Sequence, residues 1–160
     1  MNWLNPANDI GFRSWSSTLD LVKTGELLSD SRLNSLSWVQ SGGATYYVKQ
    51  YRRRGRHLRR FVGRSRARAE WENLKIFQGL GVRTARPVAF GEDNDGRGIV
   101  VTEAVVDAVD LATLARNAPV VLNGRAFQMS VGAELADVAA TLHGAGFAHG
   151  DLKRRNILVN

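Results

Sequence analysis

The residues best suited to chemistry lie near the carboxyl end of the chain, in His149-Gly150-Asp151-Leu152-Lys153-Arg154-Arg155-Asn156. Phosphoryl transfer needs a carboxylate beside the incoming hydroxyl and an oxygen ligand for the magnesium ion on the phosphates. Asp151 and Asn156 on one loop have side chains for these two tasks, and Lys153 could lie on the transferred phosphate. The alternative is an ordinary turn with a solvated basic run. The position of the loop, between a long predicted helix and an apolar strand, favours a catalytic loop.

Two charged residues upstream suit the same chemistry. Lys49 lies on a predicted strand, where a lysine can grip the α- and β-phosphates of a nucleotide if a helix glutamate holds it. Glu70 and Glu72 both lie on the next predicted helix. Glu70 shares a face with Leu74 and Phe77, so helical phase favours Glu70 as the inward carboxylate. A solvated lysine and an unrelated glutamate are the alternative for either residue taken alone.

A hinge and a phosphate-covering turn are the next expected parts. Backbone groups at Glu103 and Val105 follow a β-branched strand and could hydrogen-bond an adenine, although a buried strand followed by a loop would look the same. Tyr47 lies two residues before Lys49, on the same strand face. No Gly-x-Gly-x-x-Gly precedes Lys49, so residues 28–32 would have to serve as the turn over the phosphates.

The elements that must position these residues indicate an α+β protein in two lobes. The expected strands are 33–40, 45–51, 87–90 and 99–102, and the expected helices are 65–79, 111–115 and 127–143. We therefore expect a lead-in over 1–24, a β-rich lobe with one main helix over 25–105, and the start of a helical lobe over 106–160. Ser41-Gly42-Gly43-Ala44 is expected to be a hairpin turn.

Composition excludes several classes of protein. Of the 160 residues, 44% are apolar and none is cysteine, so a packed core is expected without disulfides or cysteine-ligated metals. Charged residues interrupt the first twenty positions, which do not form a secretory signal, and no apolar run is long enough to span a bilayer. We therefore expect a cytoplasmic protein.

The basic charge is concentrated in one segment. The chain has a net charge of +7, and the segment 49–68 contains ten Lys or Arg and no acid, which accounts for the entire basic excess. Such a patch favours an anionic partner, although a solvated loop explains any single arginine equally well. The residues expected to contact that partner are Arg52, Arg53, Arg54, Arg56, Arg59 and Arg60.

From about Leu27 onward, the sequence resembles the bacterial lipopolysaccharide core kinases of the Kdo/WaaP type, which have a protein-kinase-like fold. The resemblance rests on residues 46–51, on the arginine-rich stretch 63–71 and on residues 81–87. The Gly150-Asp151 form of the loop is similar to that of kinases for sugars and other small molecules.

The resemblance implies that ATP is the phosphoryl donor, Mg²⁺ the metal, and a sugar hydroxyl of the lipid A–core oligosaccharide the acceptor. It implies peripheral contact with the anionic cytoplasmic face of the inner membrane. Asp151 would be the base, Asn156 a magnesium ligand, and Lys49 the phosphate lysine with Glu70 as its partner. The second magnesium-binding carboxylate of such kinases has no counterpart before Asn160, so we expect a C-terminally truncated chain that is inactive alone.

Three alternatives remain open from the sequence. A kinase of the same fold could act on a protein or another small molecule. A pseudokinase scaffold would keep the fold without the reaction. A nucleic-acid-binding module would use the arginine segment, with binding that depends strongly on salt. The kinase motifs favour an enzyme over the nucleic-acid-binding module.

Overall fold

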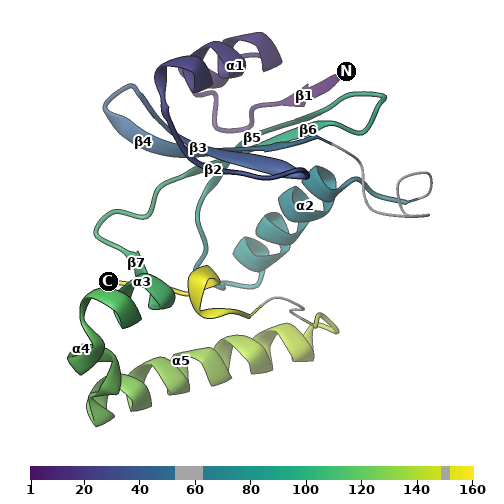
Figure 1. Cartoon of the computed structure of the whole chain (residues 1–160). Helices are drawn as coiled ribbons and strands as arrows, with labels where there is room; N and C mark the ends of the chain where they lie inside the picture. Colours follow the sequence, from purple (N-terminus) through teal and green to yellow (C-terminus); the bar gives the residue numbers. More distant parts are fainter. Residues whose placement is uncertain (53–62, 149–151) are drawn as a thin grey trace. The chain divides into compact units, whose positions relative to one another are not determined.

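The computed structural model describes residues 1–52, 63–148 and 152–160 (Figure 1). The chain divides into two compact units. The first comprises Met1–Gly79 and Arg83–Ala104, and the second Leu80–Val82 and Val105–Asn160. A β-sheet dominates the first unit and helices dominate the second, so the predicted α+β class is confirmed.

The first unit is built on a six-stranded antiparallel sheet with the order β1-β5-β6-β4-β3-β2 (Figure 1). The strands are β1 (Asn2–Leu4), β2 (Glu26–Asp30), β3 (Asn34–Ser41), β4 (Ala44–Tyr51), β5 (Pro87–Glu92) and β6 (Gly98–Glu103). Strand β4 carries Lys49 and pairs along its length with β3 and β6, which place Leu36 and Val100 opposite that lysine. Pairing on both sides holds the lysine backbone in a fixed register.

The β3–β4 connection is the expected tight hairpin. Gly42 and Gly43 have φ angles of 56° and 81°, and Ser41 pairs with Ala44 across the turn. A two-residue turn with positive φ at both central positions matches the twist of the flanking strands, and glycine adopts it without strain. This turn sets the register that carries Lys49 onto its face of the sheet.

A helix covers each face of the sheet: α1 (Trp15–Thr24) lies on one side and α2 (Arg66–Gly79) on the other (Figure 1). Alternating strand residues therefore enter two separate cores. The core on the α1 side contains Phe12, Val39, Tyr46, Val48, Val88, Ala89, Ile99 and Val101. The core on the α2 side contains Tyr51, Ala67, Trp71, Phe90 and Val100.

Helix α2 is fixed to the sheet at its first turn. The Ser65 hydroxyl accepts a hydrogen bond from the Arg68 amide at 3.0 Å, so Ser65 caps the helix. The same hydroxyl donates to Glu92 on β5 at 2.7 Å, and the Arg68 side chain also bonds to Glu92. In the same turn, a Cβ atom added to Gly98 would lie 2.3 Å from the Cβ of Ala67, so only glycine permits this approach of helix to strand.

The second unit is mainly helical. Its elements are β7 (Val109–Asp110), α3 (Leu111–Asn117), α4 (Pro119–Asn123), α5 (Arg125–Gly144), η3 (Arg154–Asn156) and β8 (Leu158–Val159). Asp110 caps α3 by accepting hydrogen bonds from the amides of Ala112 and Thr113. Strand β7 pairs with β8, and this pairing returns the end of the chain to the start of α3.

The structure differs from the sequence-based expectation in two places. Residues 1–24 were expected to be a lead-in, but β1 pairs with β5 and α1 packs on the sheet through Trp15 and Leu19. Residues 28–32 were expected to form a turn, but β2 continues to Asp30 with a register shift between Leu27 and Ser29, so the turn begins later.

Candidate functional site

The site in the first unit is centred on an ion pair between strand and helix. The Lys49 ammonium Nζ donates to Glu70 Oε2 at 2.7 Å, and each side chain is about one-third exposed, at 33% and 31%. Glu72, the competing carboxylate, bonds to Arg64 instead, at 2.5 Å. A partly buried ammonium held by one carboxylate keeps the rest of its hydrogen-bonding capacity for an incoming anion.

Tyr51 adds a second donor to the same carboxylate. Its side chain is only 6% exposed, and its hydroxyl donates to Glu70 Oε2, the oxygen that also accepts from Lys49. The ammonium lies 5.3 Å from the centroid of the Tyr51 ring, within the range of a cation–π contact. Burial, followed by the charge and hydrogen bond of Glu70, raises the pKa of Tyr51, so the phenol stays protonated at physiological pH.

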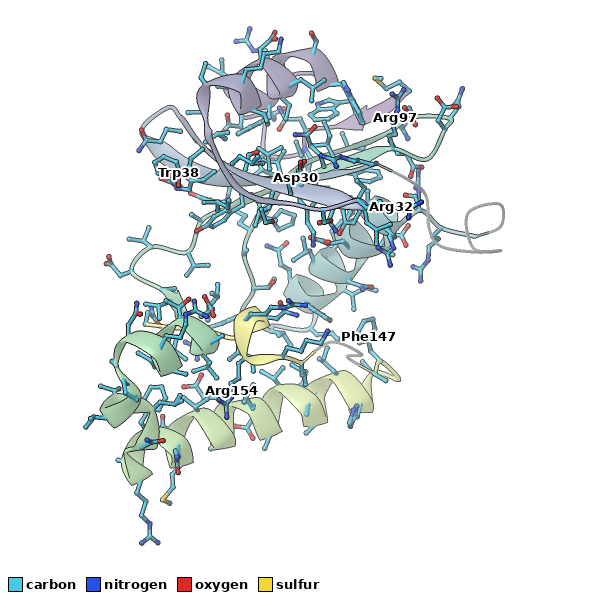
Figure 2. All side chains as sticks on the ribbon, viewed as in Figure 1. Asp30, Arg32, Trp38, Arg97, Phe147 and Arg154 are labelled. Atoms are coloured by element: carbon cyan, nitrogen blue, oxygen red, sulfur yellow. The ribbon has the colours of Figure 1, made fainter. Side chains whose placement is uncertain are left out.

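Partly exposed apolar side chains extend the Lys49 face along the sheet. Tyr47 precedes Lys49 by two residues and pairs with Trp38 on β3 and Thr102 on β6, while Leu36 lies opposite Lys49 itself. Figure 2 labels Trp38 on β3. Directly paired residues point to the same side of a sheet, so these side chains form an apolar floor beside the ammonium. Trp38 and Leu36 were not expected from the sequence, because cross-strand register is not visible in a local pattern.

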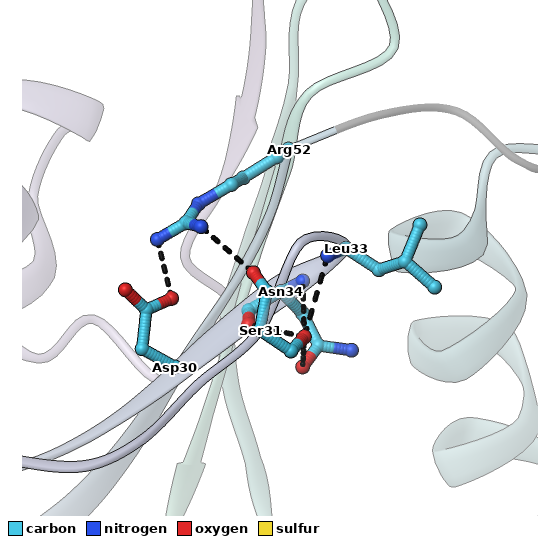
Figure 3. A network of polar contacts seen from close by, with 5 residues as sticks. All are labelled: Asp30, Ser31, Leu33, Asn34 and Arg52. Carbon is cyan, nitrogen blue, oxygen red and sulfur yellow. Dashed lines mark hydrogen bonds and ion pairs between the residues drawn. The ribbon is translucent and has the colours of Figure 1, made fainter.

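The turn between β2 and β3 is short and closed by polar contacts (Figure 3). The Ser31 hydroxyl donates to the Asn34 carbonyl at 2.8 Å and accepts from the Asn34 amide at 3.1 Å. Arg52 donates to the Ser31 carbonyl at 2.7 Å and to Asp30 Oδ1 at 2.5 Å. The residues expected to cover the phosphates therefore form a turn that is held by side chains rather than by glycines.

The backbone N–H groups of the predicted hinge differ in whether they already donate a hydrogen bond within the protein. The Glu103 amide donates to the Arg86 carbonyl at 3.0 Å, and the Ala104 amide donates to the Thr45 carbonyl at 2.9 Å. Within the described ranges, the Val105 amide has no protein acceptor. Of the two positions predicted to contact adenine, Val105 can therefore offer an N–H, whereas the Glu103 N–H is already bonded.

The predicted catalytic loop is described only in part. His149, Gly150 and Asp151 lie outside the described residues. Before them, α5 ends in a Schellman motif at Gly146, where the Phe147 amide bonds to the Leu142 carbonyl at 2.8 Å and the Gly146 amide to the His143 carbonyl at 2.9 Å. After them, the Asn156 amide bonds to the Lys153 carbonyl at 2.8 Å and η3 fixes Asn156 just before β8. Figure 2 labels Phe147 and Arg154, one on each side of the loop.

The arginine segment is also described only in part. Arg52 is bonded to Asp30 and Ser31, so it has intramolecular partners at the position where an anionic contact was expected. The other five arginines predicted for that contact lie outside the described residues. They are Arg53, Arg54, Arg56, Arg59 and Arg60.

Asn156 is the described residue that was predicted to bind Mg²⁺. Among residues 1–52, 63–148 and 152–160, no group of three or more His, Asp or Glu side chains could hold a metal ion. The Asn156 side-chain oxygen is a ligand of the type that Mg²⁺ accepts, alongside phosphate oxygens and water.

In residues 1–52, 63–148 and 152–160, no helix is both long enough and apolar enough to cross a membrane.

Comparisons with known proteins agree with this geometry. A sequence profile of the lipopolysaccharide kinase (Kdo/WaaP) family matches residues 15–160.

The structure is similar to WaaP in complex with acyl carrier protein, with a TM-score of 0.51 and 23% identity over 73% of this chain and 46% of that chain. It is also similar to the AMP-PNP-bound kinase domain of maize SIRK1 (sucrose-induced receptor kinase 1), with a TM-score of 0.63 and 15% identity over 99% of this chain and 53% of that chain. A search of curated proteins found no match. The protein-kinase-like fold predicted from the sequence is thus confirmed, and the chain spans about half the length of these two solved structures.

Proposed function

Because the chain belongs to the lipopolysaccharide kinase (Kdo/WaaP) family, we propose that it carries the ATP site of a kinase for a sugar hydroxyl of the lipopolysaccharide inner core. The observation that carries the proposal is the Lys49–Glu70 ion pair at 2.7 Å. A strand lysine held by a helix glutamate is the arrangement with which protein-kinase-like enzymes grip the α- and β-phosphates.

Further features of the two units, each taken by itself, support nucleotide binding. The Val105 amide supplies a free donor for adenine, and the apolar floor that includes Trp38 and Tyr47 offers a surface for a planar base. The turn held by Arg52 closes the strand pair that would cover the phosphates. Glu70 holds the Lys49 ammonium so that its remaining N–H donors can reach the nucleotide phosphates.

The transfer step is assigned to the loop in the second unit. Asp151 accepts the proton of the acceptor hydroxyl while the hydroxyl oxygen forms a bond to the γ-phosphorus. The bond from that phosphorus to the β–γ bridging oxygen breaks, and ADP leaves. Lys153 would contact the transferred phosphoryl group, and Asn156 would hold Mg²⁺. When bound, this metal neutralises the charge on the phosphates.

The acceptor and the location are inferred from the family, and the basic charge of the arginine segment is consistent with both. Lipid A and the core sugars are anionic and lie in an anionic leaflet, so clustered arginines near that surface contribute on the order of 1 kcal/mol each. The proposed contacts are the segment that begins at Arg53 and ends at Arg60. We place the protein in the cytoplasm, in peripheral contact with the inner membrane.

Isothermal titration of ATP–Mg²⁺ tests the nucleotide site. Lys49→Ala is expected to weaken binding at least tenfold, because a charge-assisted contact of about 1.5–3 kcal/mol is lost. Lys23→Ala is the matched control, since Lys23 also bonds a carboxylate at 2.7 Å but is 74% exposed on α1. Equal affinity in the two variants would refute the assignment of Lys49.

A second measurement tests the acceptor. Radiolabelled phosphate from ATP should be transferred to purified lipid A–core oligosaccharide by the whole protein, and Asp151→Asn should abolish the transfer. Labelling of a protein or a free sugar in place of the glycolipid would point to another acceptor. Tight RNA binding that survives Asp151→Asn, without ATP binding, would favour the nucleic-acid-binding alternative.

A further inference from the structure

Tyr51 contacts Glu70, although the proposed function assigns Tyr51 no part in nucleotide binding. It lies two residues after Lys49 on β4, so both side chains point to the α2 side of the sheet. Its ring packs in the α2-side core with Ala67 and Trp71, which flank Glu70 on the helix. The ring therefore lies in the core that α2 covers, while its hydroxyl reaches the carboxylate on the same helix.

The two donors converge on one atom of Glu70. Lys49 Nζ and the Tyr51 hydroxyl both donate to Oε2. If Lys49 were the only donor, any movement of its ammonium toward a phosphate would loosen the glutamate and the helix that carries it. A second donor from a nearly buried, rigid ring keeps the carboxylate in place during that movement.

From this geometry, we propose that Tyr51 is a positioning residue that holds Glu70, and with it α2, in the nucleotide-binding arrangement independently of Lys49. The inference rests on the proposed nucleotide site. It adds to that site a third member, which acts through Glu70 and does not touch the ligand. The Lys49–Glu70 pair is then preassembled in the free protein instead of forming when a nucleotide binds.

The chain contains a matched control on the same strand. Tyr46 is also nearly buried, at 4% exposure, and its hydroxyl donates to a carboxylate, Asp9 Oδ2, at 2.5 Å. Tyr46 points to the α1 side, away from Lys49 and Glu70. Tyr46→Phe and Tyr51→Phe therefore each remove one hydroxyl–carboxylate bond from β4, but only the second touches the candidate site.

ATP–Mg²⁺ affinity in the four-member set Tyr51→Phe, Glu70→Gln, the double variant and Tyr46→Phe tests the inference. Tyr51→Phe is expected to weaken binding about tenfold, which corresponds to about 1.4 kcal/mol, whereas Tyr46→Phe should leave it within about twofold of the unmodified chain. In the Glu70→Gln background, Tyr51→Phe should cause almost no further loss, because the two residues act as one unit. Unchanged affinity in Tyr51→Phe, or fully additive losses in the double variant, would overturn the inference while leaving the nucleotide site intact.

Failure of the nucleotide site itself would look different. If the unmodified chain does not bind ATP–Mg²⁺, the proposed function is wrong, and a double-mutant cycle in urea unfolding then decides the role of Tyr51. Coupling between Tyr51→Phe and Glu70→Gln would support the anchoring of α2 through Glu70. Additive losses of stability would overturn it.

Discussion

Glu92 links the first turn of α2 to the sheet, and its replacement by glutamine is a sharp test of how that helix is held. Its carboxylate accepts hydrogen bonds from the Ser65 hydroxyl at 2.7 Å and from Arg68 Nε at 2.9 Å, and its side chain is 18% exposed. The Arg68 guanidinium also lies 5.5 Å from the ring centroid of Phe90. The hydrogen bond to Glu92 raises the pKa of Arg68.

Glu92→Gln keeps the shape of the side chain and removes its charge. The single amide oxygen can still accept from Arg68, but the amide nitrogen, which is a donor, then faces the Ser65 hydroxyl. The loss is at least the difference between a charge-assisted and a neutral hydrogen bond. Charge-assisted bonds contribute about 1.5–3 kcal/mol and neutral ones about 0.5–1.5 kcal/mol. We therefore expect the free energy of unfolding to fall by about 1–2 kcal/mol, and amide exchange in the first turn of α2 to accelerate.

Urea denaturation followed by tryptophan fluorescence measures this change, because Trp71 lies on α2 in the affected core. Asp20→Asn is the matched control, since Asp20 bonds to Lys23 at 2.7 Å but is 65% exposed. Exposed ion pairs contribute at most about 1 kcal/mol, so the control should change stability by less than about 0.5 kcal/mol. Equal losses in the two variants would refute the assignment of Glu92 as the anchor of α2.

Three further predictions concern the cap, the turn and the α1-side core. Asp110→Ala should cost the second unit about 0.5–2 kcal/mol of stability by circular dichroism. The Thr113 hydrogen bond lowers the pKa of Asp110, so this contribution is present at neutral pH and is lost as pH falls below about 4. Arg52→Ala should accelerate amide exchange at Ser31 while changing global stability by no more than about 1 kcal/mol, because the Arg52–Asp30 pair is half exposed. The hydrogen bond to Asp9, followed by burial, raises the pKa of Tyr46 to about 12. Because an unfolded tyrosine loses its proton near pH 10, stability should fall between about pH 10 and pH 12, and this fall should be shallower in Tyr46→Phe when followed by alkaline unfolding.

Local signals were strong where the sequence predicted the fold well. The paired glycines of the β3–β4 turn, the Ser65 cap of α2 and the Asp110 cap of α3 each act through neighbouring residues, so a single sequence is sufficient to find them. Helical phase likewise favoured Glu70 over Glu72, and the structure places Glu70 beside Lys49. The roles assigned to these residues in catalysis stay predictions.

Long-range pairing accounts for what the sequence did not predict. Strand β1 has three residues and exists through its pairing with β5, nearly ninety positions later, so no local pattern marks it. Helix α1 begins at a capping box in which Ser17 takes the place usually held by Glu or Gln, and it contains Ser and Thr residues of modest helix propensity. The contact between Tyr51 and Glu70 was missed for the same reason, because the two residues lie nineteen positions apart on different elements.

The close approach at Gly98 links two positions that touch no ligand to the geometry of the candidate site. Gly98 lies opposite Tyr51 across the β4–β6 ladder, and Ala67 lies one helical turn before Glu70. A methyl group added at Gly98 would displace α2 and with it the carboxylate that Lys49 and Tyr51 share. Change at these two positions is therefore epistatic: a larger residue at 98 is tolerated only when position 67 loses its own methyl group. Natural variation in this pair would shift Glu70 relative to Lys49 while every residue of the candidate site stays the same.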